Sequence, residues 1–222
     1  SEDLLSIVSR VFLDRGDEVV TVVPFFCLHF IYPMAAGARV VGVPMTADGA
    51  FDVAAMIAAL TPRTRLLMFS CPSNPVGSTL NADELQQLLA ALPAYCLLVL
   101  DEAYYEYAQH EAGYPDCLGL IQDSAKPFIL LRTFSKAYSL AGLRIGYGIV
   151  SDPVLADLID RLRTPFNINR VAQAAAVAAL ADDEHLHATL EHVARERRRM
   201  AIALQGLGIV SVPSMANFLF FS

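Results

Sequence analysis

One lysine, Lys136, stands in a sequence context that could turn its amine into a nucleophile. It follows an apolar run, residues 128–131, that is typical of a buried strand, and a second cation, Arg144, comes eight positions later in a small, hydroxyl-rich segment. A lysine that is desolvated or close to another cation loses its proton more readily and can then form a Schiff base with a carbonyl compound. Taken alone, the segment is more simply a surface loop, so the interpretation depends on what the rest of the chain places beside it.

Two further strand-like runs also end in polar residues. Residues 65–69 lead into a proline- and glycine-rich loop that contains Asn74, and residues 96–100 lead directly into Asp101 and, shortly after, Tyr104. Ligands of open α/β sheets bind outside the carboxyl ends of the strands, so we expect these side chains to meet the lysine. An amine, a carboxylate, a phenol, an amide, hydroxyls and an arginine together suit an aldehyde cofactor with a ring nitrogen, a phenolic oxygen and a phosphate, which describes pyridoxal phosphate. Each residue by itself has a plainer interpretation, as a helix cap, a packing aromatic or a turn residue.

Strand-like and helix-like patterns alternate along the chain, which indicates a parallel sheet with helices on both faces. The expected strands are residues 18–23, 39–43, 65–69, 96–100, 128–131 and 145–150. The connection between the last two has about thirteen residues and no amphipathic helix, whereas a parallel crossover usually needs one. We therefore predict that residues 145–150 run antiparallel to their neighbours.

The expected helices are residues 1–12, 25–36, 52–60, 81–92, 171–180 and 185–207, with a further one from 152 that is interrupted at Pro165. Asp52 and Asn81 are suitable N-caps. Pro33 should break or kink the second helix, because proline lacks the backbone N–H and clashes with the preceding turn. The arginine cluster at 195–199 is expected to be a solvated face of the last helix.

The composition excludes several classes of protein. With 55 % hydrophobic and 18 % charged residues among 222, the chain can bury a large core and is not expected to be disordered. The net charge of −7 argues against nucleic acid as a partner, and no apolar run reaches the ~18 residues of a membrane span. Four cysteines without a Cys-x-x-Cys spacing indicate reduced thiols. Without a signal peptide in the sequence, we expect a cytoplasmic protein, and we expect no metal site.

Three segments resemble the fold-type I pyridoxal-phosphate aminotransferases. They are the loop 71–77, the strand end 98–104 and the lysine segment 132–147. Within that superfamily, residues 165–169 (Pro-Phe-Asn-Ile-Asn) and 213–218 (Pro-Ser-Met-Ala-Asn-Phe) are similar to the histidinol-phosphate aminotransferases. The resemblance extends over essentially the whole chain.

This resemblance implies a fold and a domain organisation. The fold is α/β, with three α-β-α layers and a mostly parallel seven-stranded sheet that has one antiparallel strand. Residues 1–222 correspond to the large, cofactor-binding domain, and we expect the chain to be truncated at both ends, with the C-terminal small domain largely absent. That small domain carries the family's arginine for the substrate carboxylate, so a chain that ended here would not be an efficient catalyst.

The resemblance also implies roles for the residues around the cofactor. Lys136 forms the Schiff base with pyridoxal phosphate and later moves a proton between the substrate α-carbon and the cofactor. Asp101 pairs with the ring nitrogen, which keeps the ring protonated and able to accept electrons. Tyr104 and Asn74 hydrogen-bond the phenolic oxygen, and Phe26 stacks on the ring face.

A second set of matched residues surrounds the cofactor phosphate and the substrate. The phosphate is bound by a cation, two hydroxyls and the backbone N–H groups of a helix N-terminus. These groups come from Arg144, Thr133, Ser135, Ser1 and Glu2. Asn167 and Asn217 match positions that line the substrate side. Ser139 departs from the family pattern, because it replaces a frequent glycine.

The function that the resemblance implies is transamination between L-histidinol phosphate and 2-oxoglutarate, in histidine biosynthesis. The partners would be a small-molecule amino donor, a 2-oxo acid acceptor and a second copy of the chain in a homodimer, without nucleic acid or membrane. Two enzymes on the same scaffold remain as alternatives, an aromatic amino acid aminotransferase and a threonine-phosphate decarboxylase. An alternative of another class is the ligand-sensing, aminotransferase-like domain of a transcription regulator, which a winged helix before residue 1 would indicate.

Overall fold

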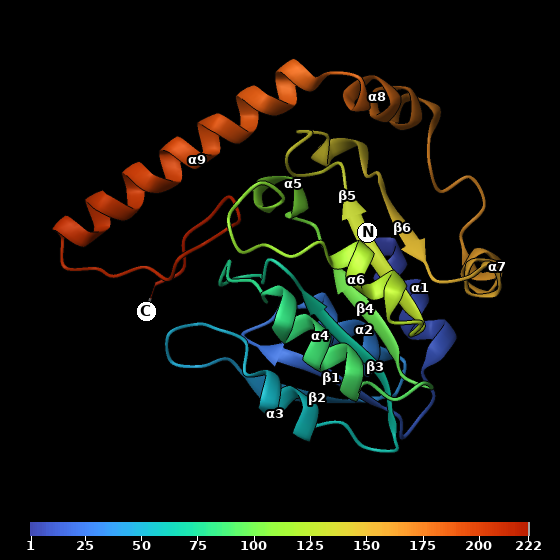
Figure 1. The fold of residues 1–222 in the computed structure, drawn as a ribbon. Helices are drawn as coiled ribbons and strands as arrows, with labels where there is room; N and C mark the ends of the chain where they lie inside the picture. The colour runs from blue at the N-terminus through green and yellow to red at the C-terminus, as the bar shows by residue number, and fades with distance from the viewer. Residues whose placement is uncertain (222) are drawn as a thin grey trace.

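A six-stranded sheet runs through the centre of the molecule, in the order β2-β1-β3-β4-β5-β6 (Figure 1). The computed structural model describes residues 1–221. The strands are β1 Glu18–Val23, β2 Arg39–Pro44, β3 Thr64–Ser70, β4 Leu97–Asp101, β5 Phe128–Thr133 and β6 Gly146–Val150. Neighbouring strands from β2 to β5 pair in parallel, and β6 pairs antiparallel with β5. The predicted direction of the last strand is therefore confirmed, since only the short 3₁₀ helix η1 Ala141–Leu143 lies in its connection.

The expected number of strands was wrong, because the sheet has six strands in the described residues and not seven. Residues 218–221, an apolar run with the pattern of a strand, do not join the sheet; one isolated bridge links Phe220 to Val212. The segment just before it is held elsewhere: the Met215 N–H donates to the Gly77 carbonyl, and the Phe218 ring packs edge-on against Tyr104. These contacts tie the end of the described chain to loops of the sheet and not to a sheet edge.

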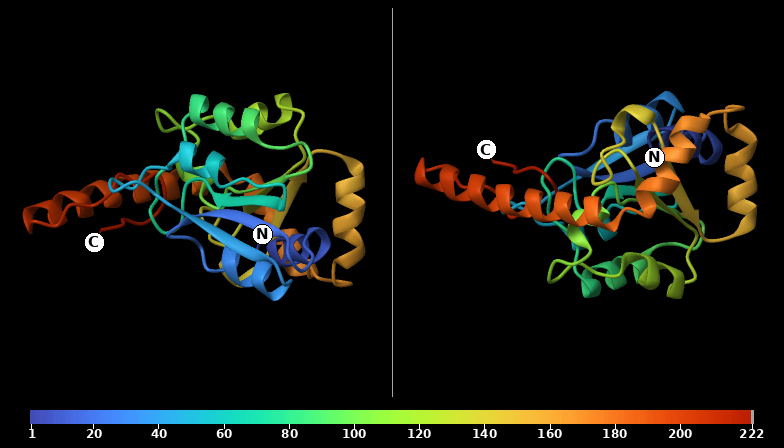
Figure 2. Two further views of the ribbon diagram at one scale, coloured as in Figure 1. Left: turned by 90° about the horizontal axis from the view of Figure 1, so that it is seen from below. Right: turned by 90° about the horizontal axis from the view of Figure 1, so that it is seen from above.

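Helices cover both faces of the sheet, which confirms the three-layer α-β-α fold (Figure 2). They are α1 Glu2–Phe12, α2 Leu28–Ala35, α3 Val53–Ala58, α4 Ala82–Ala91, α5 Tyr105–Ala108, α6 Cys117–Asp123, α7 Pro153–Leu162, α8 Arg170–Leu180 and α9 Asp183–Gly206. Side chains of α3, α4 and α6 pack on one face, and those of α1, α2 and α7 on the other. Successive residues of β4 alternate between the two cores, Leu98 and Leu100 in one, Leu97 and Val99 in the other. Each such side chain stabilises the fold by roughly 1.5–3 kcal/mol when fully buried.

The long helix α9 runs along the outside of these layers (Figure 1). Its apolar residues Leu186, Leu190 and Val193 pack partly on a cluster around Tyr104. No helix in residues 1–221 combines the length and the apolar character that a membrane crossing requires.

The expectation that the arginine cluster of α9 is simply solvated was wrong for Arg197. Its side chain is only 13 % exposed, and it donates to the Ala216 carbonyl at 2.7 Å and pairs with Glu111 at 2.6 Å. The guanidinium is hydrogen-bonded by a carbonyl and a carboxylate from two different loops and is therefore largely shielded from solvent. Arg197 thus joins α9 to the rest of the domain.

Pro33 was expected to break or kink the second helix; it does not break it, because α2 continues through Pro33 to Ala35. Pro33 is one of the buried residues of α2. Proline cannot donate the backbone hydrogen bond that a helix residue normally makes. Because α2 ends only two residues after Pro33, the loss of this one bond affects only the last turn of the helix.

One buried carboxyl, that of Glu106 in α5, has no ion-pair partner among the described residues. The residue is 4 % exposed, and its Oε2 atom has no hydrogen-bond partner in this part of the chain. Burial raises the pKa of this carboxyl from its ordinary value of 4.5 to about 7. The folded protein therefore keeps a proton on Glu106 at a pH where the unfolded chain has released it.

This raised pKa predicts a pH-dependent loss of stability between about pH 4.5 and pH 7. We expect Glu106→Gln to remove that loss, so that its free energy of unfolding, relative to the wild type, increases by about 3 kcal/mol between pH 4.5 and pH 8. Urea unfolding followed by circular dichroism at both pH values measures the change. Glu191→Gln, on the exposed face of α9, is the control and should show no such increase. Parallel curves for Glu106→Gln and the wild type would contradict the prediction.

Candidate active site

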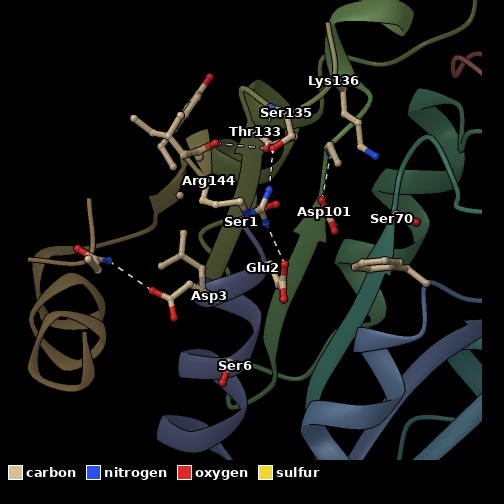
Figure 3. A pocket seen from close by; sticks show the side chains of 18 of the residues that line it. Ser1, Glu2, Asp3, Ser6, Ser70, Asp101, Thr133, Ser135, Lys136 and Arg144 are labelled. Atoms are coloured by element: carbon tan, nitrogen blue, oxygen red, sulfur yellow. Dashed lines mark hydrogen bonds and ion pairs between the residues drawn. The ribbon is translucent and has the colours of Figure 1, made fainter. Parts of the chain in front are cut away.

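The carboxyl ends of β3, β4 and β5 open on one cavity of about 750 Å³, as predicted from the strand-end loops (Figure 3). The start of α1 and the loop before α2 complete its walls. Eleven of the predicted residues line the cavity: Ser1, Glu2, Phe26, Asn74, Asp101, Tyr104, Thr133, Ser135, Lys136, Arg144 and Asn167. A cavity of this size is in the usual range of small-molecule sites.

Lys136 extends its amine into this cavity from the loop that follows β5 (Figure 3). Backbone hydrogen bonds hold the loop, from Leu140 N–H to the Phe134 carbonyl and from Ser139 N–H to the Lys136 carbonyl. The Lys136 Nζ atom lies 5.1 Å from the ring centroid of Tyr104. Within residues 1–221 it has neither a carboxylate partner nor a hydrogen bond, so a half-buried amine is left available to a ligand.

Asp101 ends β4 at the floor of the cavity and is 4 % exposed. Its Oδ1 atom accepts a hydrogen bond of 3.1 Å from the Ala103 N–H. Its Oδ2 atom lies 3.4 Å from Nε2 of the buried His29, although the geometry is not that of a hydrogen bond and this nitrogen has no other partner in the described chain. A buried carboxylate with lone pairs left over is suited to a donor group of a ligand.

His29 was missed by the sequence interpretation, although one signal pointed to it. It follows Phe26 by three residues at the start of α2, a spacing that puts both side chains on one side of the chain. Their rings pack edge-to-face, with centroids 5.7 Å apart. Nothing in the sequence indicated that this side faces Asp101.

Tyr104 and Asn74 form a polar pair on the cavity wall. The Asn74 Nδ2 atom donates to the Tyr104 hydroxyl at 3.1 Å, and the Ser70 hydroxyl accepts a hydrogen bond from the Asn74 N–H. Burial, together with the charge of Asp101, raises the pKa of Tyr104 to about 12. Its neutral hydroxyl can therefore donate to a ligand oxygen while it accepts from Asn74.

An anion cradle lies at the other end of the cavity, where α1 begins. Ser1 makes no side-chain cap, and residues 1–3 line the cavity, so the positive end of the α1 dipole lies at its wall. Arg144 lies beside them, with Nη1 3.5 Å from the Ser135 hydroxyl and Nη2 2.9 Å from the Glu2 carboxylate. The Glu2–Arg144 pair is more than half exposed, and such ion pairs contribute little, so a more highly charged anion could replace Glu2. The Thr133 hydroxyl is occupied within its own loop, since it accepts from the Ser135 N–H and contacts the Ile145 carbonyl.

A buried ion pair beneath the cavity was not predicted. Glu102 is fully buried, and its Oε2 atom accepts from Nε and Nη2 of Arg132, each at 2.8 Å. The Tyr114 hydroxyl donates to the other carboxylate oxygen at 2.8 Å, and the Arg132 guanidinium lies 3.4 Å from the ring centroid of Tyr105. Burial alone would lower the pKa of Arg132, but the Glu102 carboxylate raises it, so the arginine stays charged.

The two asparagines predicted for the substrate side are placed differently. Asn167 lines the cavity, where it donates to Asp3 at 3.3 Å and accepts from Arg163 at 3.4 Å. Asn217 is exposed and is not part of the cavity lining, although its neighbour Phe218 packs on Tyr104. Their roles toward a substrate stay predictions.

Comparisons with known proteins agree on one family. The model of the family "Aminotransferase class I and II" matches residues 1–222. Histidinol-phosphate aminotransferase 1 of Mesorhizobium japonicum is 49 % identical over 222 residues, which are 100 % of this chain and 60 % of that protein. An aromatic amino acid aminotransferase of Rhodococcus erythropolis is 41 % identical over 95 % of this chain and 58 % of its own length.

A solved structure shows the same fold. The crystal structure of histidinol-phosphate aminotransferase from Sinorhizobium meliloti in complex with pyridoxal-5'-phosphate matches with a TM-score of 0.87 at 36 % identity, over 97 % of this chain and 58 % of that one. The chain thus spans about 60 % of the length of the first curated relative.

Proposed function

The chain belongs to the class I and II aminotransferases, and from that membership we propose that residues 1–222 form the pyridoxal-phosphate-binding large domain of a transaminase. One observation carries the proposal: the unpartnered amine of Lys136 shares a cavity with the buried Asp101 carboxylate and the Tyr104–Asn74 pair. These are the groups that a cofactor with an aldehyde, a ring nitrogen and a phenolic oxygen needs. The complex of the Sinorhizobium meliloti relative with pyridoxal-5'-phosphate supports the same cofactor here.

The residues present fit this cofactor. Pyridoxal phosphate, when bound, supplies an aldehyde that condenses with amines and a ring that draws electrons from the substrate α-carbon. The Oδ2 atom of Asp101 does not bind the Ala103 N–H and can accept a hydrogen bond from the ring nitrogen of the cofactor. Phe26 lines the same cavity and can stack on the ring face. Tyr104 and Asn74 are paired so that both can reach one phenolic oxygen.

The anion cradle at the start of α1 fits the cofactor phosphate. Arg144 and the Ser135 hydroxyl supply a cation and a donor, and the backbone of Ser1 and Glu2 supplies N–H groups at the positive end of a helix. Glu2 must release Arg144 when a phosphate binds, which costs little for so exposed a pair. Thr133 belongs to the same proposal and acts there by shaping the loop, because its hydroxyl accepts from the Ser135 N–H.

Lys136 has a second task in this proposal, which is to move a proton. A neutral lysine amine beside the cofactor can take the proton from the substrate α-carbon and return it at the neighbouring C4′ atom of the cofactor. The cavity wall supports this chemistry, because the Tyr104 ring lies beside the amine and no carboxylate of the described chain pairs with it. Within the described chain, Lys136 is therefore free of competing partners.

We further propose L-histidinol phosphate as the amino donor and 2-oxoglutarate as the acceptor. The name of the Mesorhizobium japonicum relative supports this choice. The Rhodococcus erythropolis relative makes an aromatic amino acid the second candidate for the donor. Asn167 and Asn217 belong to the proposal as residues of the substrate side, with the cavity position of Asn167 in its favour.

A cytoplasmic homodimer completes the proposal. Phe166 is 99 % exposed, and an apolar residue left in water supports a surface that a second copy of the chain covers. The free thiols of all four cysteines are consistent with a reducing compartment.

Reductive trapping tests the lysine, because the chain has only two, Lys136 and Lys126. We expect borohydride treatment of the protein with pyridoxal phosphate to attach the cofactor to Lys136, as located by mass spectrometry of tryptic peptides. Lys136→Arg should lose the label. Lys126→Arg is the matched control and should keep it, because Lys126 lies outside the cavity and donates to the Leu92 carbonyl. Equal labelling of both variants would remove Lys136 from the proposal.

An amino-donor panel on the full-length protein tests the substrate. With 2-oxoglutarate as acceptor, we expect kcat/KM for histidinol phosphate to exceed that for phenylalanine, tyrosine and aspartate by about tenfold or more, since a site with hydrogen-bonding partners for one substrate rejects analogues that leave them unpaired. Formation of glutamate is the measurement. A preference for phenylalanine or tyrosine would overturn the donor but leave the transaminase. Absence of turnover with every donor, in a protein that traps the cofactor on Lys136, would favour a ligand sensor.

A further inference from the structure

The acidic side chain at the first position of α1 is held by two different donors. The Glu2 Oε2 atom accepts from Nη2 of Arg144 at 2.9 Å, and its Oε1 atom accepts from the Tyr32 hydroxyl at 3.4 Å. Tyr32 belongs to α2 and lines the same cavity. Each carboxylate oxygen therefore has its own donor, and only one of the two donors is the cation to which a phosphate would bind.

One half of the Arg144 guanidinium is committed to its own loop. Its Nη1 atom donates to the Ala141 carbonyl at 2.9 Å and lies 3.5 Å from the Ser135 hydroxyl, whereas Nη2 holds Glu2 (Figure 3). An anion that binds in the cradle therefore competes with Glu2 for Nη2, and the carboxylate has to move. It stays close by, because it belongs to the first turn of α1, where the helix dipole favours a negative charge. Without a new partner, the displaced carboxylate would repel the bound phosphate.

Tyr32 is a fixed donor beside this mobile acid. Its ring packs against the core on the face of the sheet that α1 and α2 cover, whereas the Glu2 side chain is more than half exposed and free to change rotamer. Burial, followed by the charge of Glu2, raises the pKa of Tyr32, so the hydroxyl keeps its proton. The distance of 3.4 Å is long, since hydroxyl donors commonly lie about 2.7–2.8 Å from their acceptor. The bond can therefore shorten when the carboxylate turns away from Arg144.

The second acid of α1 is arranged in the same way. The Asp3 Oδ2 atom accepts from Nδ2 of Asn167 at 3.3 Å (Figure 3). Both acids of the first turn thus have a neutral donor from another element, Tyr32 from α2 for Glu2 and Asn167 from the loop before α8 for Asp3. A neutral donor holds a carboxylate through a hydrogen bond and leaves the cation of the cradle to an incoming anion.

We infer that Tyr32 is a positioning residue of the anion cradle, which receives the Glu2 carboxylate when a phosphate takes its place on Arg144. The inference rests on the proposed function, because it needs the cofactor phosphate at Arg144. Tyr32 acts through Glu2 and not on the phosphate itself. By giving the displaced carboxylate a hydrogen bond, it turns the charge of Glu2 away from the phosphate and so strengthens the binding of the cofactor.

The test compares pyridoxal phosphate with pyridoxal, which lacks the phosphate. Absorbance titrations of the full-length protein, freed of cofactor, measure the Kd of each. We expect Tyr32→Phe to weaken the binding of pyridoxal phosphate about threefold to tenfold, the range for the net loss of one hydrogen bond, and to leave the binding of pyridoxal unchanged. The variant keeps the ring that packs in the core. Tyr95→Phe is the matched control, which removes the hydroxyl of an exposed tyrosine outside the cavity lining and should change neither Kd.

A second variant shows whether Tyr32 acts through Glu2. Glu2→Gln carries no charge to oppose the phosphate, so it should bind pyridoxal phosphate at least as tightly as the wild type does. In the background of Glu2→Gln, the further change Tyr32→Phe should have little additional effect. A full additional loss in that background would mean that Tyr32 acts on the phosphate or on the fold directly, and the inference would be wrong. Equal losses for pyridoxal phosphate and pyridoxal would have the same meaning.

The outcomes also distinguish this inference from the proposed function. If borohydride attaches pyridoxal phosphate to Lys136 and Tyr32→Phe binds the cofactor as tightly as the wild type, the inference is wrong and the function stands. If the wild-type protein does not take up pyridoxal phosphate at Lys136, the proposed function fails and the inference is overturned with it.

Discussion

The buried ion pair between Glu102 and Arg132 is the constraint on which the geometry of the site depends. The pair joins the carboxyl ends of β4 and β5, at the point where their backbone pairing stops. A backbone hydrogen bond from the Glu102 N–H to the Leu131 carbonyl lies beside it. The residue before Glu102 is Asp101, and the loop after Arg132 carries Lys136, so this pair sets the distance between carboxylate and amine. Removal of either partner would leave an uncompensated charge in the interior, which typically costs about 3–5 kcal/mol. The two strand ends that carry the carboxylate and the amine are therefore tied together by this pair.

The antiparallel return of β6 brings the third group, the cation, back to the same edge of the sheet. Because no helix intervenes between β5 and β6, Arg144 stays within reach of Ser135 and of the start of α1. This return needs a glycine at its closest point, since a Cβ atom on Gly146 would lie 2.8 Å from the Arg132 carbonyl oxygen and 2.5 Å from the backbone nitrogen of Ser1. A helix N-terminus and an arginine that are far apart in the sequence thus form one anion cradle.

Local patterns in the sequence predicted what depends on local physics. Continuous apolar runs placed the strands, the missing crossover helix predicted the direction of β6, and Asn81 is the expected N-cap of α4. The frequent glycine that Ser139 replaces is explained by a φ of 58°, a conformation that costs any other residue. Contacts between distant segments could not be predicted in this way. Arg197 is taken out of solvent by a carbonyl from another loop, and His29 lies in an apolar run that shows no sign of the carboxylate it faces.

The two acids on the cavity wall have opposite surroundings, and that difference divides their roles. Asp101 has an N–H donor on one oxygen and an imidazole beside the other, which is an environment made for a charged acceptor. Tyr104 is kept neutral by burial and by the charge of Asp101 itself, which together raise its pKa to about 12. In the proposed function, this carboxylate therefore does two things: it accepts a hydrogen bond from the protonated ring nitrogen of the cofactor, and its charge opposes ionisation of the phenol. A carboxylate that accepts and a neutral phenol that donates can therefore act side by side on one ligand. Burial is the larger cause of the raised pKa of Tyr104, so the phenol stays a donor chiefly because its hydroxyl is out of water.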